Sequence, residues 1–170
     1  MRNIEMKARC DDRANAIAVC ESIGARFEGD IHQLDTYFTV PSGRLKLREA
    51  QPGPTELVSY HRPDVAGPKG CDYRLEPVQA TLKIMLSEVL GVEAVVDKLR
   101  SLYLWKNVRI HLDTVKGLGS FIEFEAVLDD EHDDADGVKK LAFLIEAFKI
   151  GDDAHQEYSY LELVTSESRS

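Results

Sequence analysis

The 170-residue sequence has few cysteines and no long hydrophobic run. Its three cysteines, Cys10, Cys20 and Cys71, form neither a CxxC pair nor a Cys/His cluster, which argues against a disulfide framework and a zinc site. No apolar stretch approaches the roughly 20 residues that cross a bilayer, and the first ten residues, MRNIEMKARC, carry charges throughout, unlike a signal peptide. These absences predict a cytoplasmic protein with reduced thiols and no membrane partner.

The chain also lacks an excess of basic residues. It contains 21 Lys and Arg against 30 Asp and Glu, which gives a formal net charge of −9. Because affinity for nucleic acids comes largely from Lys and Arg that neutralise phosphates, this balance argues against a nucleic-acid partner. Length and a hydrophobic content of 44% predict one domain, over residues 1–165, with a disordered tail over 166–170.

What the sequence does contain is a series of short segments in which polar and apolar residues alternate, as is typical of strands. Strands are predicted at residues 4–9, 33–40, 44–49, 56–62, 92–105, 108–113, 121–127 and 158–164. The first half of the 92–105 segment is also compatible with an extension of the preceding helix. Gly and Pro between the second and third strands, and Gly between the sixth and seventh, predict antiparallel hairpins.

Three helices are predicted at residues 11–25, 77–91 and 133–151, from Asp or Pro near their starts and Gly near their ends. In the second helix, Leu82, Met85, Leu86 and Leu90 recur at helical spacing, which predicts packing against the sheet. Residues 64–72, DVAGPKGCD, are predicted to form a flexible connection.

One strand face in the stretch GRLKLREA is entirely basic. Arg44, Lys46 and Arg48 share this face, while Leu45 and Leu47 point to the other side. Other predicted strands repeat the pattern with charged rows at Glu5/Lys7/Arg9, Lys98/Arg100, Arg109/His111/Asp113 and Glu123/Glu125. A sheet with one face in water explains any single row. Taken together, the rows are almost purely ionic. In the basic rows, no acidic residues alternate with the cations to reduce the repulsion between them.

If the sheet closes into a barrel with these rows inside, the cations need anions to neutralise them. A polyphosphate meets that need, because Arg forms bidentate hydrogen bonds with phosphate and Lys supplies a point charge. Glu5, Glu123 and Glu125 would then hold a hard cation, Mg²⁺ or Mn²⁺, which takes carboxylate and phosphate oxygens together.

The segments NIEMK, QLDTYF, GRLKLRE, ELVSYHRPD and LRSLYLWKNVRIHLDTVKGLGSFIEFE occur in this order. Their series resembles the CYTH superfamily, the triphosphate tunnel metalloenzymes, most closely the class IV adenylyl cyclase-like branch, over essentially the whole chain. The resemblance implies an α+β fold, in which an antiparallel eight-stranded β-barrel forms a tunnel with a charged interior and helices packed outside. It also implies a bound triphosphate and a divalent metal.

Carried over by position, the phosphate ligands would be Lys7, Arg44, Lys46, Arg62, Lys98, Arg100 and Arg109. The metal ligands would be Glu5, Glu123 and Glu125, and the catalytic residues Lys7, Arg62 and Asp113, the last positioning a nucleophile or a metal-bound water. The family signature Glu-x-Glu-x-Lys reads here with Asn3 in place of the first Glu. Since Asn3 keeps an oxygen acceptor without the charge, a metal at that position would be held more weakly.

Arg9 and Arg48 are equally compatible with the tunnel and with the surface, and His111 is interpreted as a hydrogen-bonding wall residue rather than a proton relay. The first function hypothesis is an adenylyl cyclase that acts on ATP. The second is a triphosphatase that hydrolyses an organic triphosphate or tripolyphosphate, and the third is a protein that binds a nucleotide or polyphosphate without turnover. The partner is a nucleoside triphosphate or another triphosphate, and the chain is expected to be a monomer or a homodimer.

Overall fold

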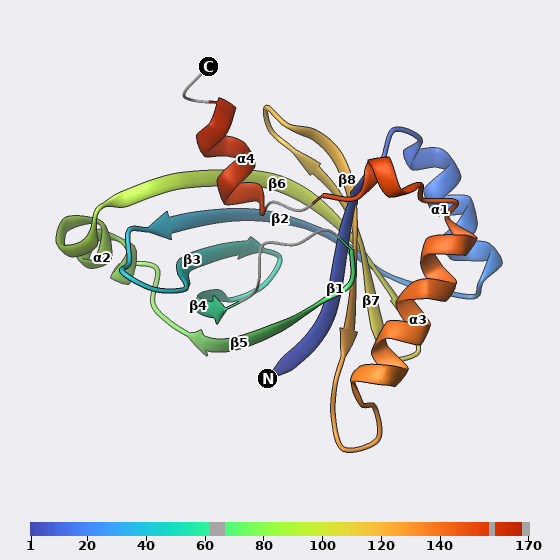
Figure 1. The fold of residues 1–170 in the computed structure, drawn as a ribbon. Helices are drawn as coiled ribbons and strands as arrows, with labels where there is room; N and C mark the ends of the chain where they lie inside the picture. The colour runs from blue at the N-terminus through green and yellow to red at the C-terminus, as the bar shows by residue number, and fades with distance from the viewer. Residues whose placement is uncertain (62–66, 157–158, 168–170) are drawn as a thin grey trace.

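The computed structural model describes residues 1–61, 67–156 and 159–167. Eight strands in these residues close into one antiparallel barrel, as the charged rows and the resemblance predict (Figure 1). The strands are β1 Arg2–Arg9, β2 Arg26–Phe38, β3 Arg44–Gln51, β4 Thr55–His61, β5 Lys69–Pro77, β6 Val92–Trp105, β7 Val108–Val115 and β8 Gly119–Val127. Around the barrel they follow the order β1-β5-β4-β3-β2-β6-β7-β8.

Both predicted hairpins are confirmed. β2 pairs with β3 in antiparallel register, and β7 pairs with β8 across a tight turn in which Gly117 adopts a φ of +83°. A residue with a side chain rarely takes that backbone conformation, so glycine suits the turn. The longest ladder joins β2 to β6 and forms one broad wall of the barrel.

In the described parts of the chain, four α-helices lie outside the barrel: α1 Arg13–Ser22, α2 Leu82–Leu90, α3 Asp134–Ala147 and α4 Tyr160–Glu167. A 3₁₀ turn, η1 Asp152–Ala154, precedes α4. Side chains cap three of the described helices. Asp12 accepts a hydrogen bond from the Asn15 amide in α1, Asp133 accepts one from the Asp136 amide in α3, and the Ser159 hydroxyl accepts one from the Glu162 amide in α4. None of the described helices combines the length and the apolar character that crossing a bilayer requires.

The main apolar core lies between the barrel wall and two helices. α1 and α3 cover the outer side of the wall near β1, β7 and β8 (Figure 1). The cluster joins outward-facing strand residues to helix residues, and its fully buried members include Ala8, Cys20, Val108, Ile110, Leu112, Phe124, Leu141 and Leu144. The outer face of the wall is therefore sealed by apolar packing, which leaves the charged rows on the inner face.

Two sequence predictions about the strands are wrong. The sequence predicts a strand at residues 158–164, but Tyr160–Glu167 form helix α4. The strand that completes the set of eight is instead β5, Lys69–Pro77. β5 overlaps the connection that is predicted at 64–72. The alternating pattern of this strand begins only at Cys71, and Gly70 and the preceding Gly-Pro favour a turn, so the sequence does not indicate a strand there. Apolar residues at 160, 161, 163 and 164 also fit helical spacing, and burial of Tyr160 and Leu161 against the barrel favours the helix.

Of the residues predicted to form the tail, 166 and 167 belong to α4, while 168–170 lie outside the described residues. The second helix is predicted to begin at residue 77, but α2 begins at Leu82, and Pro77 is instead the last residue of β5.

The predicted packing of α2 is wrong. No residue of α2 is buried; Leu82, Leu86 and Leu90 are half-buried, whereas Met85 is 63% exposed. The reason is its place in the fold: α2 lies beyond the ends of β2 and β6 rather than across the barrel wall (Figure 1).

Candidate functional site

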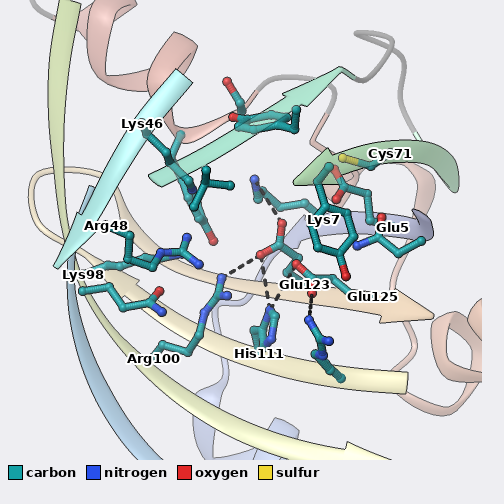
Figure 2. A pocket seen from close by; sticks show the side chains of 18 of the residues that line it. Glu5, Lys7, Lys46, Arg48, Cys71, Lys98, Arg100, His111, Glu123 and Glu125 are labelled. Atoms are coloured by element: carbon teal, nitrogen blue, oxygen red, sulfur yellow. Dashed lines mark hydrogen bonds and ion pairs between the residues drawn. The ribbon is translucent and has the colours of Figure 1, made fainter. Parts of the chain in front are cut away.

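The barrel encloses a cavity of about 300 Å³. Because alternate strand residues face inward, this cavity collects the charged rows of several strands. Among the described residues, six cationic side chains line it: Lys7, Lys46, Arg48, Lys98, Arg100 and Arg109. Three carboxylates line it as well, Glu5, Glu123 and Glu125. Figure 2 shows these side chains converging from opposite walls, so the interior holds cations and acids in a single space.

Strand register places acids beside bases in two rows. Glu123 lies between Lys7 of β1 and His111 of β7, and Glu125 lies between Glu5 and Arg109 in the next row. Lys7 Nζ is 3.6 Å from Glu123 Oε1, and Arg109 Nη1 is 3.5 Å from Glu125 Oε2. Both separations exceed the usual length of a charge-assisted hydrogen bond.

Asp113 does not line the cavity. It is completely buried and anchors the wall behind Arg100, whose Nε and Nη2 donate to the two Asp113 oxygens at 2.7 and 2.6 Å. Arg100 Nη2 also donates to Glu123 at 2.7 Å, and the Tyr160 hydroxyl donates to Asp113 at 2.9 Å. Burial would raise the pKa of Asp113, but Arg100 and Lys98 hold it well below its usual value. Asp113 therefore orients cations rather than facing a nucleophile.

Lys98 is a buried cation with a lowered pKa. Burial, and then the Arg100 guanidinium, lower the pKa of Lys98 to about 7, although Asp113 Oδ2 lies 3.1 Å from its ammonium. Its Nζ and that of Lys7 lie 4.8 and 3.8 Å from the centre of the Tyr160 ring. A cation over an aromatic face is stabilised by the ring quadrupole, so Tyr160 supports both lysines where α4 meets the cavity.

Sequence reasoning missed Asp35 of β2. This buried carboxylate accepts hydrogen bonds from Lys46 at 2.7 Å and from Arg48 at 2.8 and 2.9 Å. Burial opposes its ionisation, but Arg48 and Lys46 hold the pKa of Asp35 well below its usual value. These contacts settle the two alternatives for Arg48, which lines the cavity. The signal was present, because Asp35 alternates with Gln33 and Tyr37 on one strand face.

The remaining predicted cations are less central. Arg44 does not line the main cavity; its Nη2 lies 2.6 Å from Glu162 Oε1 of α4, at the barrel end which that helix covers. Arg9 is exposed, stacks over Phe121 and donates to the Leu118 carbonyl, so it belongs to the surface. Arg62 lies outside the described residues.

The acidic side of the cavity has the donor set of a divalent-cation site. His111, Glu123 and Glu125 each offer one ligand atom, and these three atoms lie within 4.8 Å of one another. Burial and the nearby Arg100 lower the pKa of His111, which favours the neutral imidazole that binds metals, and Lys7 and Arg100 help hold the pKa of Glu123 well below its usual value despite burial. The buried Asn3 Oδ1 lacks a hydrogen-bond partner among the described residues. The carboxylate oxygens of Glu123 and Glu125 and the imidazole nitrogen of His111 fit a cation such as Mg²⁺ or Mn²⁺.

Comparison with known proteins agrees with this geometry. Residues 1–160 match the family model of the CYTH domain. The chain therefore belongs to the CYTH domain family. This match confirms the resemblance that the strand motifs carry.

Three relatives illustrate the range of the similarity. A protein of Methanocaldococcus jannaschii named "putative adenylate cyclase" is 24% identical over 174 residues, which cover 96% of this chain and 98% of the relative. A Vibrio parahaemolyticus structure described in the same words has a TM-score of 0.78 and 23% identity, over 96% of this chain and 97% of its own. A structure from Hippeastrum, for which a dominant triphosphatase activity is described, has a TM-score of 0.64 and 12% identity, over 98% and 96%.

Proposed function

We propose that this protein is a metal-dependent enzyme that acts on a nucleoside triphosphate, with the conversion of ATP to cyclic AMP and pyrophosphate as its reaction. The observation that carries the proposal is the cavity itself, in which six cationic side chains and a His/Glu/Glu group face one another. A triphosphate carries several negative charges in a row, and such a ligand needs both groups at once.

In this proposal each wall has a separate task. The phosphate oxygens are held by two cationic walls, Lys46 and Arg48 on β3 and Lys98 and Arg100 on β6. Asp35 fixes the positions of the first pair, and Asp113 fixes those of the second. His111, Glu123 and Glu125 would hold the metal, with Glu5 and Asn3 alongside on β1. When bound, the divalent ion would supply Lewis-acid stabilisation of phosphate charge.

For cyclisation, the ribose 3′-hydroxyl loses its proton to water as its oxygen attacks the α-phosphorus, the bond from that phosphorus to the bridging oxygen breaks, and pyrophosphate leaves. The charge that develops on the leaving group falls among fixed cations, which stabilise it without reorganising. Arg100 is the best placed of these, since it is held by Asp113 and Glu123 and is only 5% exposed.

A triphosphatase is the second candidate, because the same cations would stabilise a terminal phosphate attacked by water and a dominant triphosphatase activity is described for the Hippeastrum relative. A binding protein without turnover is the third. The observation favouring it is Asn3, whose amide replaces a carboxylate and leaves a buried oxygen without a partner in the described part of the chain.

Product analysis separates the three. Purified protein is incubated with ATP, and separately with tripolyphosphate, in Mg²⁺ and then in Mn²⁺, and the products are resolved by chromatography. Cyclic AMP with pyrophosphate establishes the cyclase, whereas orthophosphate without cyclic nucleotide moves the assignment to a triphosphatase. If neither product forms, Asn3→Glu is tested: a large gain in metal-dependent turnover indicates a weakened enzyme, and continued inactivity indicates a binding protein.

A further inference from the structure

Arg44 and Glu162 join the barrel to helix α4. Arg44 is the first residue of β3, and its Nη2 donates a hydrogen bond to Glu162 Oε1 over 2.6 Å. Their side chains are only 14% and 28% exposed. Both residues line a second cavity, of about 190 Å³, and neither lines the main one. The pair therefore belongs to the barrel end and not to the cations inside.

Glu162 also fixes the first turn of α4. Its other oxygen, Oε2, accepts hydrogen bonds from the Ser159 amide at 2.6 Å and from the Ser159 hydroxyl at 2.8 Å. In return, the Glu162 amide donates to the Ser159 hydroxyl oxygen at 3.4 Å, which caps the helix. One carboxylate thus connects β3 to the residue that precedes α4, and its loss would release both contacts.

The first residue of α4 reaches the barrel interior. Tyr160 is 4% exposed, and its hydroxyl donates to Asp113 Oδ2 at 2.9 Å. The same oxygen accepts hydrogen bonds from Lys98 at 3.1 Å and from Arg100 at 2.6 Å. The Tyr160 ring also lies against the ammonium groups of Lys7 and Lys98. The position of α4 therefore affects three of the cations that line the main cavity.

We propose that Arg44 and Glu162 form a latch that holds α4 across the barrel end. Held there, α4 uses Tyr160 to keep the neighbouring cations in place for a triphosphate, so Arg44 is a positioning residue rather than a phosphate ligand. This inference rests on the proposed function and adds how its phosphate site is held together. Because coupling between two events is reciprocal, a triphosphate that binds better with α4 in place also stabilises α4 in place.

Electrostatics separates this role from a direct contact between Arg44 and phosphate. If Arg44 bound phosphate, removal of its acidic partner would leave the cation more available, and an anionic ligand would bind as tightly or more tightly. If the pair is a latch, loss of either partner loosens the same helix. Glu162 then promotes the binding of an anion, although its own charge repels that anion.

The first test measures ATP affinity of the full chain by calorimetry in EDTA, which suppresses metal-dependent turnover. Arg44→Gln and Glu162→Gln are each expected to weaken ATP binding about three- to tenfold, the size of a typical coupling between sites. The double variant should bind ATP no more than about twofold more weakly than either single variant, because both changes open the same contact.

Tyr160→Leu tests the route from the latch to the cations. It removes the ring and the hydroxyl together, so it should weaken ATP binding at least as much as Glu162→Gln does. In the Tyr160→Leu background, Glu162→Gln should have less than about a twofold further effect. If Tyr160→Leu does not fold, as judged by thermal unfolding, Tyr160→Phe replaces it and should also reduce the effect of Glu162→Gln.

Hydrogen exchange, followed by mass spectrometry, observes the helix itself. In the ligand-free protein, Glu162→Gln should speed exchange of the amides of residues 160–167 at least about threefold, because the helix opens more often. In the wild-type protein, saturating ATP should slow exchange of the same amides. A direct phosphate contact of Arg44 predicts no effect of Glu162→Gln on exchange in the free protein.

Glu49→Gln and Lys83→Gln are the matched controls. Their residues form another ion pair between β3 and a helix, α2, with side chains 29% and 33% exposed. Each control removes the same charge as its counterpart in the latch, so neither should change ATP affinity or exchange in α4. Lys46→Ala tests the phosphate site separately, because Lys46 lines the main cavity.

The latch is overturned if Glu162→Gln leaves ATP affinity unchanged or raises it, if the two single losses add in full, or if ATP does not slow exchange in α4. An undiminished effect of Glu162→Gln in the Tyr160 variant overturns the route through Tyr160. The proposed function survives these results as long as Lys46→Ala weakens ATP binding. If the wild-type protein does not bind ATP, the proposed function fails, and exchange in ligand-free Glu162→Gln still decides whether the pair holds α4.

Discussion

The two faces of the barrel wall are both buried, but for opposite reasons. On β7, Ile110 and Leu112 point outward into the apolar core, whereas His111 and Asp113 on the inner face contact charged groups. Apolar burial stabilises the folded state in proportion to its area. Buried ion pairs contribute little net stability, because desolvation of the charges offsets their attraction. The contribution of these pairs to stability therefore does not by itself account for the composition of the inner face.

The largest effect is expected for Glu123→Ala on the inner face. Glu123 contacts His111, Arg100 and Lys7, so its loss removes a proposed metal ligand and a partner of the cations. Metal-dependent turnover should fall by about 10³-fold, as for loss of a central electrostatic group. Steady-state rates in Mn²⁺ measure this. Glu49→Ala is the control, because Glu49 pairs with Lys83 of α2 rather than with a cavity residue, and a comparable loss in that variant would refute a specific role for Glu123.

The reverse result is expected for Leu141→Ala on the outer side. Leu141 of α3 is fully buried in the apolar core, and truncation there typically costs about 2–5 kcal/mol of unfolding free energy through lost burial and a residual cavity. Urea denaturation measures the loss, and calorimetry below the unfolding transition should show unchanged ATP affinity. A lowered affinity in the folded variant would mean that the two faces are not independent.

A smaller effect is expected for Arg48→Ala, which should weaken ATP binding about 10- to 100-fold because a charge-assisted contact with phosphate is lost. Asp35 keeps Lys46 but loses two hydrogen bonds from Arg48, which will also lower stability and is recorded separately by thermal unfolding. Lys83→Ala removes an equal charge from the partly exposed pair with Glu49 and should not change affinity. Equal losses in the two variants would point to net charge rather than the cavity.

The smallest effect concerns pH. With a pKa near 7, Lys98 is cationic below pH 7 and loses its charge as the pH rises through that value. The charged groups that act on it are Asp35, Arg48, Arg100 and Asp113, and Tyr160 lies against it. ATP affinity should therefore fall several-fold between pH 6 and pH 8. Lys98→Arg, which stays charged, should flatten the profile relative to wild type and so separate this effect from titration of ATP itself. Identical profiles would exclude Lys98 as the source.

Much of the wall was predictable, because period-two alternation assigns each strand residue to a face. It placed Lys46, Arg100 and Glu123 inside correctly. Alternation does not give depth, however, and for this reason it could not distinguish Arg100, which lines the cavity, from Asp113, which lies behind it. Alternation also assigns Arg9 to the inner face, but Arg9 is the last residue of β1 and lies at the surface.

The parts that could not be predicted depend on partners distant in sequence. β5 is held as a strand by pairing with β1 and β4, although Gly70 interrupts its pattern. Arg44 meets Glu162 only because α4 folds back across the barrel end. The local spacing of residues 160–164 suits a strand or a helix, and tertiary packing of Tyr160 selects the helix.

The most direct test of the charged inner face is a calorimetric comparison of ATP with AMP on the wild-type protein. If the cations hold a triphosphate, ATP should bind at least about 100-fold more tightly than AMP, because its two additional phosphates each gain charge-assisted hydrogen bonds. Equal affinities would contradict the account, since the inner face would then be an ion-pair network with no triphosphate to hold.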